Sequence, residues 1–171
     1  MTRTLTNETI NNIDKEITLY GWVNTFRNHG KIAFLDLRDR SGIVQCVDTT
    51  GKISVSNEDV IKIVGLVRKR PEKMVNPKIP TGTVEVSIKK LEIIASAAEL
   101  PFAIDTDGYE INEEIRMKYR YLDIRRYRIA NNLRLRSRMT TFIRNFLSNQ
   151  DFTEIETPML TKTTPEGARD F

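Results

Sequence analysis

Cysteine and histidine are nearly absent from this sequence, which has one of each, Cys46 and His29, among 171 residues. A lone cysteine rules out an internal disulfide, and the scarcity of both residues excludes most metal sites and Ser/His/Asp catalytic sets. No glycine-rich phosphate loop is present either. Cys46 lies in a strand-like run, so we expect a buried, inert thiol. The chemistry of the chain itself is therefore expected to be binding.

Long apolar runs are also missing. No stretch approaches the roughly 18 apolar residues of a membrane span, and residues 1–13 lack the apolar centre of a signal peptide. The composition, 39% hydrophobic and 29% charged, is that of a globular protein. With the single cysteine, these features predict a cytoplasmic location. The length allows a small domain followed by a piece of another, because domains commonly hold about 100 to 150 residues.

Positive charge is concentrated in one part of the chain. The net charge is +4, yet ten basic residues lie between Arg116 and Arg144 against a single acid, Asp123. Such a cluster suits a nucleic-acid backbone, because each neutralised phosphate releases condensed counterions. It is equally consistent with a solvated helix face or with a surface paired with acids elsewhere.

Five strand-like runs fill the first hundred residues and are separated by turn residues. They span residues 16–24, 31–39, 42–48, 60–68 and 83–94. Five strands is the count of an OB-fold barrel, so we predict this β-rich fold for residues 1–100, with a short helix at 57–61. The strand pattern stops at Leu100, which predicts a hinge at 101–115. A different domain is expected over residues 116–171, beginning with helical character at 112–121.

An amphipathic helix is predicted over residues 133–149, because its apolar residues recur at helical spacing. They are Leu135, Met139, Ile143 and Phe146. After it, Ile155 alternates with polar residues on the way to Pro158, which predicts an extended segment. A stripe of this kind normally needs a partner surface to cover it.

Three segments of the chain resemble one known family. The helix followed by Phe152, Glu156-Thr157-Pro158 and Leu160 resembles the first signature motif of class II aminoacyl-tRNA synthetases. Residues 164–171, TPEGARDF, resemble a loop of bacterial-type aspartyl-tRNA synthetases. Residues 118–126, KYRYLDIRR, resemble the segment that opens their catalytic domain, although Tyr127 stands where the family usually has proline. The resemblance runs over nearly the whole chain.

The resemblance implies an anticodon-binding OB domain followed by the start of an α+β catalytic domain with an antiparallel sheet, cut within that domain. The family uses ATP and Mg²⁺ to convert L-aspartate to aspartyl-adenylate and then charges tRNA(Asp). Its ATP-clamping arginines and metal-binding acids lie downstream of residue 171, so this chain alone is expected to hold no catalytic residue, to bind no cofactor and to be inactive. Pro158 belongs to the motif that forms the family's homodimer. Glu166 matches a residue that helps to hold the substrate aspartate, although the spacing from Thr163 also fits a helix capping box.

Strand periodicity singles out Phe34 independently of the family. In residues 32–38, Ala33, Leu35 and Leu37 share one face, so Phe34 is predicted to point away from it. An outward ring can stack on an unpaired base, or it can fill a corner of the barrel. In the family, the matching ring stacks on the central anticodon base, and the matching residue to Gln45 reads that base.

Three more residues take roles from the resemblance. Arg27 matches a contact to the anticodon loop, and Glu85 matches an acid near the outer anticodon bases. A solvated turn arginine and an edge-strand charge are the plainer interpretations of these two residues. His29 lies in a turn where some members that also charge tRNA(Asn) have histidine, which gives the hypothesis of a relaxed specificity; a lone turn histidine is otherwise simply solvated.

Two other functions stay open from the sequence. The chain can be a stand-alone OB-fold RNA-binding module, or a part of a lysine or asparagine enzyme of the same subclass. Residues 165–171 and Gln45 disfavour the second alternative. The presence or absence of the family's second and third motifs downstream distinguishes the enzyme from the module.

Overall fold

The computed structural model describes residues 3–159. The contacts divide the chain into two compact units, Met1–Leu100 and Pro101–Phe171. The boundaries of a hinge between them stay a prediction.

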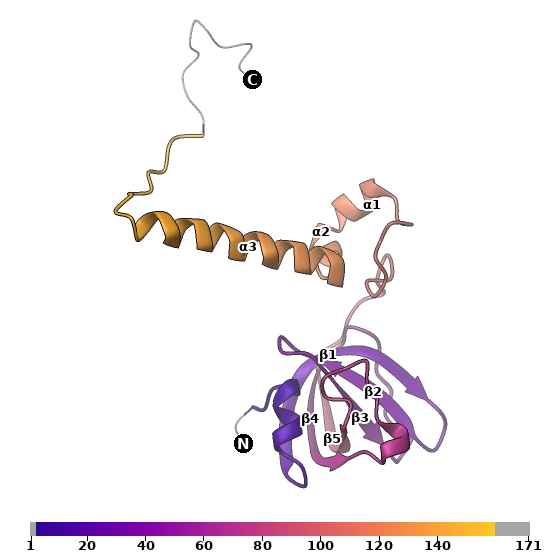
Figure 1. The fold of residues 1–171 in the computed structure, drawn as a ribbon. Helices are drawn as coiled ribbons and strands as arrows, with labels where there is room; N and C mark the ends of the chain where they lie inside the picture. The colour runs from indigo at the N-terminus through magenta and orange to yellow at the C-terminus, as the bar shows by residue number, and fades with distance from the viewer. Residues whose placement is uncertain (1–2, 160–171) are drawn as a thin grey trace, which may run out of the picture. The chain divides into compact units, whose positions relative to one another are not determined.

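The first unit is a closed barrel of five strands (Figure 1). The strands are β1 (Glu16–Asn28), β2 (Ala33–Arg38), β3 (Ile43–Asp48), β4 (Val60–Lys69) and β5 (Val84–Ala95). Their order around the barrel is β1-β2-β3-β5-β4, and every neighbouring pair is antiparallel except β3 and β5. The five predicted strands and the OB-fold are thus confirmed.

Alternating side chains fill the barrel. In β2 the residues alternate between buried and half-buried along the whole strand, as period two requires. The core collects apolar side chains from all five strands, including Leu19, Leu35, Val44, Ile61 and Val86. Cys46 is one of these core residues, so its expected burial is confirmed, and burial raises the pKa of its thiol.

Gly21 marks a place where two strands come too close for a side chain. A Cβ at this position would lie 2.3 Å from the carbonyl oxygen of Arg38 on β2. Such a distance is a clash with backbone, which cannot move aside without opening the β1–β2 pairing. Glycine is therefore required here by barrel closure.

The prediction of a helix at residues 57–61 is wrong. Residues 57–58 form a turn, and β4 begins at Val60. The backbone N–H of Glu58 donates to the carbonyl of Val23 at 2.7 Å, and Val23 donates to Asp59 at 2.9 Å. Glu58 has a φ of 71°, which a right-handed helix does not allow. Hydrogen bonds to β1 therefore hold the segment outside helical geometry.

Two short 3₁₀ helices complete the first unit, η1 (Thr6–Asn11) and η2 (Glu72–Met74). The Asp39 carboxylate anchors η1, because it accepts hydrogen bonds from the Thr6 backbone at 2.9 Å and from the Thr6 hydroxyl at 2.8 Å. The same carboxylate accepts from the Ser41 hydroxyl at 2.6 Å. Asp39 thereby closes the turn between β2 and β3 against the N-terminal segment.

The regular secondary structure of the second unit is helical in the part of the chain that the structure describes. It contains α1 (Glu113–Lys118), α2 (Arg120–Asp123) and α3 (Tyr127–Ser148), so α3 begins before the predicted residue 133. Tyr127 is the first residue of α3. Proline is favoured at that position because the N–H there has no partner within the helix, and tyrosine only adds back that N–H. The departure from the family pattern therefore leaves the helix start intact.

Apolar side chains of α3 and the segment after it are exposed. The exposed fraction is 52% for Leu135, 56% for Met139, 52% for Ile143 and 54% for Phe146. Residues 152–158 form neither a helix nor a paired strand. Among residues 3–159, no helix is long and apolar enough to cross a membrane.

Candidate nucleic-acid interface

Four adjacent strands of the barrel place polar and aromatic side chains on one outer surface. This outer face consists of Arg27 on β1, Phe34 and Asp36 on β2, Gln45 on β3 and Glu85 on β5. Arg27 pairs with Phe34 across β1 and β2, and Asp36 pairs with Gln45 across β2 and β3. Cys46 pairs with Val86 in the parallel β3–β5 ladder, so Gln45 and Glu85, each one residue earlier, lie side by side. All five are at least partly exposed.

Phe34 points outward, as the strand pattern predicts. It is half-buried, whereas its neighbours Ala33 and Leu35 each have only 1% of their surface exposed. The imidazole of His29 lies edge-on to the ring, with 5.9 Å between centroids and an angle of 71° between the planes. Phe26, not Phe34, is the phenylalanine that packs against the core. His29, on the turn between β1 and β2, thus contacts the Phe34 ring from one side.

Arg27 and Asp36 form an ion pair beside this ring, with 3.3 Å between Nη2 and Oδ2. Burial raises the pKa of Asp36 above its usual 3.8, and the charges of Arg27 and Arg70 oppose that rise. Because the pKa of Asp36 rises overall, the loss of hydration around its carboxylate outweighs the attraction of the two arginines. Arg27 is exposed, so its remaining donors stay accessible to solvent.

Arg70 connects Gln45 to Glu85. Its side chain is only 4% exposed, and its Nη2 donates to Oε1 of Gln45. Its Nε lies 3.6 Å from Oε2 of Glu85, an ion-pair distance without a hydrogen bond. Because β5 is paired with β3 on one side and β4 on the other, Glu85 is not an edge-strand charge.

The second unit contains a cluster of charges around Asp123, whose side chain is fully buried. Its carboxylate accepts hydrogen bonds from Arg116 at 3.1 Å, Arg120 at 2.9 Å and Arg126 at 3.0 Å. Three of the ten basic residues between Arg116 and Arg144 are thus paired with the one acid among them. This part of the basic cluster is structural.

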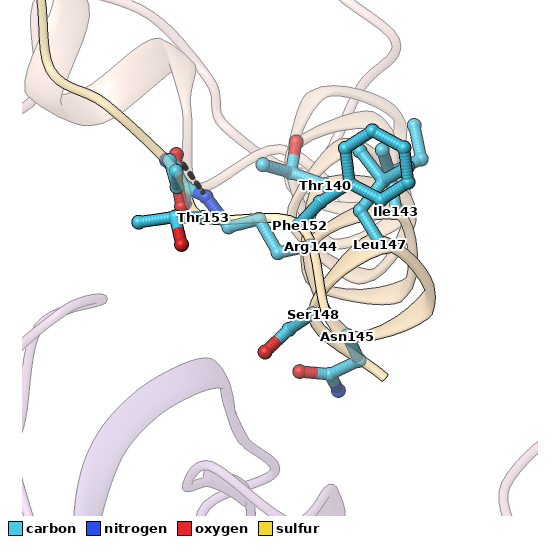
Figure 2. Close-up of a pocket in the computed structure, with 9 residues that line it drawn as sticks. Thr140, Ile143, Arg144, Asn145, Leu147, Ser148, Phe152 and Thr153 are labelled. Carbon is cyan, nitrogen blue, oxygen red and sulfur yellow. Dashed lines mark hydrogen bonds and ion pairs between the residues drawn. The ribbon is translucent and has the colours of Figure 1, made fainter. Parts of the chain in front are cut away.

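A groove of about 750 Å³ runs along α3 in the second unit. The segment after the helix turns back beside it, and Figure 2 shows Phe152 on the side of Ile143 and Leu147. Arg144 and Glu154 form an ion pair at 2.9 Å across the groove, and both are 60% exposed. Asn145 and Ser148 also line the groove, and Figure 2 shows them apart from Thr140 and Ile143. Ile143 is the residue of the exposed apolar stripe that lines this groove.

Comparison with known proteins decides the family. Residues 17–95 match the OB-fold nucleic acid binding domain, and residues 112–171 match the tRNA synthetases class II (D, K and N). The chain is 51% identical over 164 residues to an aspartate–tRNA(Asp/Asn) ligase of Moorella thermoacetica and 49% identical over 168 residues to one of Corynebacterium jeikeium. The chain belongs to the aspartyl-tRNA synthetase family.

The match covers most of the chain but a smaller share of each relative. It spans 92% of this chain and 27% of the Moorella protein, and 94% and 28% for the Corynebacterium protein. Among solved structures, a putative aspartyl-tRNA synthetase from Leishmania major Friedlin aligns with a TM-score of 0.81 at 26% identity, over 92% of this chain and 34% of its own. An asparaginyl-tRNA synthetase from Pyrococcus horikoshii, complexed with asparaginyl-adenylate, has a TM-score of 0.78 at 25% identity, over 98% and 39%. These structures place the chain in the aspartyl/asparaginyl-tRNA synthetase fold.

The structure brings together the residues that the aspartyl-tRNA synthetase resemblance selects. Arg27, Phe34, Gln45 and Glu85 share the outer face, and His29 borders it. Pro158 is exposed in the segment after α3. Glu166, the expected aspartate contact, lies outside the described residues. No group of three or more histidine, cysteine, aspartate or glutamate side chains able to hold a metal occurs within residues 3–159.

Arg70 is a residue of this site that the sequence pattern did not single out. It directly follows β4, which ends at Lys69. The structure buries it because the backbone at the end of β4 is paired, with the Arg70 N–H donating to the Thr83 carbonyl at 2.9 Å. Strand alternation from the buried Val67 places Arg70 on the opposite face, so the strand pattern gives no signal for this burial, and β4 ends at Lys69.

Proposed function

We propose that this chain is the anticodon-binding domain and the beginning of the catalytic domain of an aspartate–tRNA ligase. The complete protein attaches L-aspartate to tRNA(Asp) with ATP and Mg²⁺ through aspartyl-adenylate. The relatives at about half identity carry the support for the enzyme. The outer face carries the support for the role of this part.

The outer face has the groups that recognition of unpaired bases requires. A ring such as Phe34 stacks on any base, while an amide and a carboxylate distinguish base edges by donors and acceptors. Arg27 supplies an exposed cation for the phosphate backbone. We assign Phe34 and Gln45 to the central anticodon base, Glu85 to an outer base, and Arg27 to the loop.

His29 supports a specificity that includes tRNA(Asn). Its ring contacts Phe34, so it lies beside the proposed stacking position. The Moorella and Corynebacterium relatives carry tRNA(Asp/Asn) in their names. Similar charging rates for the two tRNAs by the complete protein would support this specificity, and a discrimination of several hundredfold would contradict it.

Two further roles come from the family. Pro158 and the exposed stripe of α3 belong to a homodimer interface, and Glu166 contacts the substrate aspartate. The complete enzyme acts in the cytoplasm, which the buried, unpaired thiol of Cys46 supports. The resemblance assigns the ATP-clamping arginines and metal-binding acids to motifs that this chain does not match, so we expect no aspartate-dependent exchange of pyrophosphate into ATP by this chain.

The affinity of the chain for RNA hairpins tests the proposal. A hairpin with the GUC anticodon should bind more tightly than one with the same stem and an unrelated loop, at one fixed salt concentration. Equal binding would contradict anticodon recognition and would leave a non-specific OB module as the function of the first unit. The alternative of a lysine enzyme predicts instead a preference for a UUU anticodon.

A further inference from the structure

Arg70 lies between two residues of the outer face without belonging to it. Its guanidinium donates to Gln45 through Nη2 and to the Met74 carbonyl through Nη1 at 3.4 Å. Glu85 is its counter-charge, at 3.6 Å from Nε. With 4% of its side chain exposed, Arg70 has little surface left for a ligand. Its effects on binding must therefore pass mainly through its neighbours.

The contact fixes which end of the Gln45 amide faces outward. A guanidinium has five N–H donors and no acceptor, so the end of the amide that meets it must be the oxygen. The Gln45 NH₂ group then lies at the opposite end, with both of its donors available. Without Arg70 the amide could turn over and offer either an acceptor or donors, because the two ends have almost the same shape.

We infer that Arg70 is a positioning residue that holds Gln45 as a hydrogen-bond donor, so that this place on the outer face selects a base with a carbonyl acceptor. The inference rests on the proposed function, since it concerns the base that Gln45 contacts. Uracil offers two carbonyl oxygens, and adenine offers none. A fixed donor disfavours adenine because the N6 amino group of adenine is also a donor, and the two-bond contact of an amide with adenine N6 and N7 needs the amide oxygen that Arg70 holds.

Affinity for four hairpins that differ only at the central anticodon base tests this role. The variants are Arg70→Met and, as control, Arg68→Met, which removes the same charge. Arg68 is exposed on β4 and pairs with Glu85 in register, but no contact to Gln45 is present. The unchanged chain should prefer uracil over adenine by about tenfold. In Arg70→Met this preference should shrink to about threefold or less, because either end of the amide can face the base. Arg68→Met should weaken all four hairpins alike and keep the tenfold preference.

A second variant guards against a folding defect in Arg70→Met. Gln45→Glu keeps a partner for Arg70 and should preserve the thermal midpoint, but it carries no donor, so the preference for uracil should be lost. An undiminished preference in a folded Arg70→Met chain, or in Gln45→Glu, would overturn the positioning role while leaving anticodon binding intact. No preference in the unchanged chain would contradict the proposed function as well.

Discussion

Asp123 and Arg126 form an ion pair in which neither side chain has any exposed surface, with 3.0 Å between Oδ1 and Nε. Arg126 also donates to the backbone and hydroxyl of Thr106, at 2.9 and 2.7 Å, and its guanidinium lies 5.1 Å from the centre of the Phe102 ring. These contacts tie residues 102–106 to the start of α3. Gly108 makes room for them, because a Cβ there would lie 2.8 Å from Nε of Arg126.

Replacing Asp123 by alanine should destabilise the second unit, because it leaves buried Arg126 without its counter-charge. Breaking a buried pair from one side costs about 3 to 5 kcal/mol. Amide hydrogen exchange over α1 to α3 measures the loss, and the barrel amides provide the internal reference. The exposed pair Arg144–Glu154 is the matched control, since Glu154→Ala should cost less than about 1 kcal/mol. Equal effects of the two substitutions would contradict this account of the cluster.

Acid should destabilise the barrel through Asp39 and Asp48. Burial alone would raise the pKa of both, but hydrogen bonds from Ser41 and Thr6 to Asp39, and from Thr50 to Asp48, outweigh it and hold each pKa below 3.8. The unfolded chain, with aspartate near 3.9, then takes up protons first, so stability is complete above about pH 5 and falls as the pH drops through the folded pKa. Asp36 acts in the opposite direction, because its pKa is raised.

Urea unfolding at a series of pH values measures this acid dependence. Asp39→Asn should be less stable than the unchanged chain at pH 7 and should lose less on acidification. A stability that stays constant between about pH 5 and 2.5 would show that these hydrogen bonds do not favour the charged carboxylates.

Gly21→Ala should destabilise the barrel by about 3 kcal/mol, because the added Cβ meets the Arg38 carbonyl on β2. Gly30→Ala is a useful comparison: nothing lies within 4 Å of its added Cβ, and only the left-handed backbone at φ 82° opposes the change. That substitution should cost about 1 kcal/mol. Thermal unfolding ranks the two, and the reverse order would refute the close approach of β1 and β2.

Phe34→Ala should reduce affinity for the GUC hairpin by about 1 to 3 kcal/mol, the usual contribution of one stacked base. Its half-buried position outside the core predicts a smaller effect on the thermal midpoint than Phe26→Ala, whose ring packs against the core. Phe34→Trp retains a stacking surface and should keep most of the affinity. An unchanged affinity in Phe34→Ala would remove the ring from the interface.

Strand alternation made most of the barrel predictable, since each of the five strands has one face buried. It also gave the outward direction of Phe34. The segment 57–61 could not be assigned in this way, because hydrogen bonds to β1 determine its conformation. The same holds for the arginines: Arg70 and Arg126 are indistinguishable in the sequence from exposed basic residues, and only folding brings a carboxylate to each. The roles of the outer-face residues come from the family, because their shared surface depends on strand order, which the pattern of each strand alone does not contain.

Backbone amide NMR during titration with the GUC hairpin tests the central claim, that the outer face binds the anticodon. The account predicts that the largest shift changes centre on Arg27, Phe34, Gln45 and Glu85, with smaller changes at Lys62 and Glu92, which pair with each other on β4 and β5. They should weaken when the central uracil is replaced. Changes spread evenly over the lysine-bearing surfaces of the barrel, and unaffected by the central base, would contradict it.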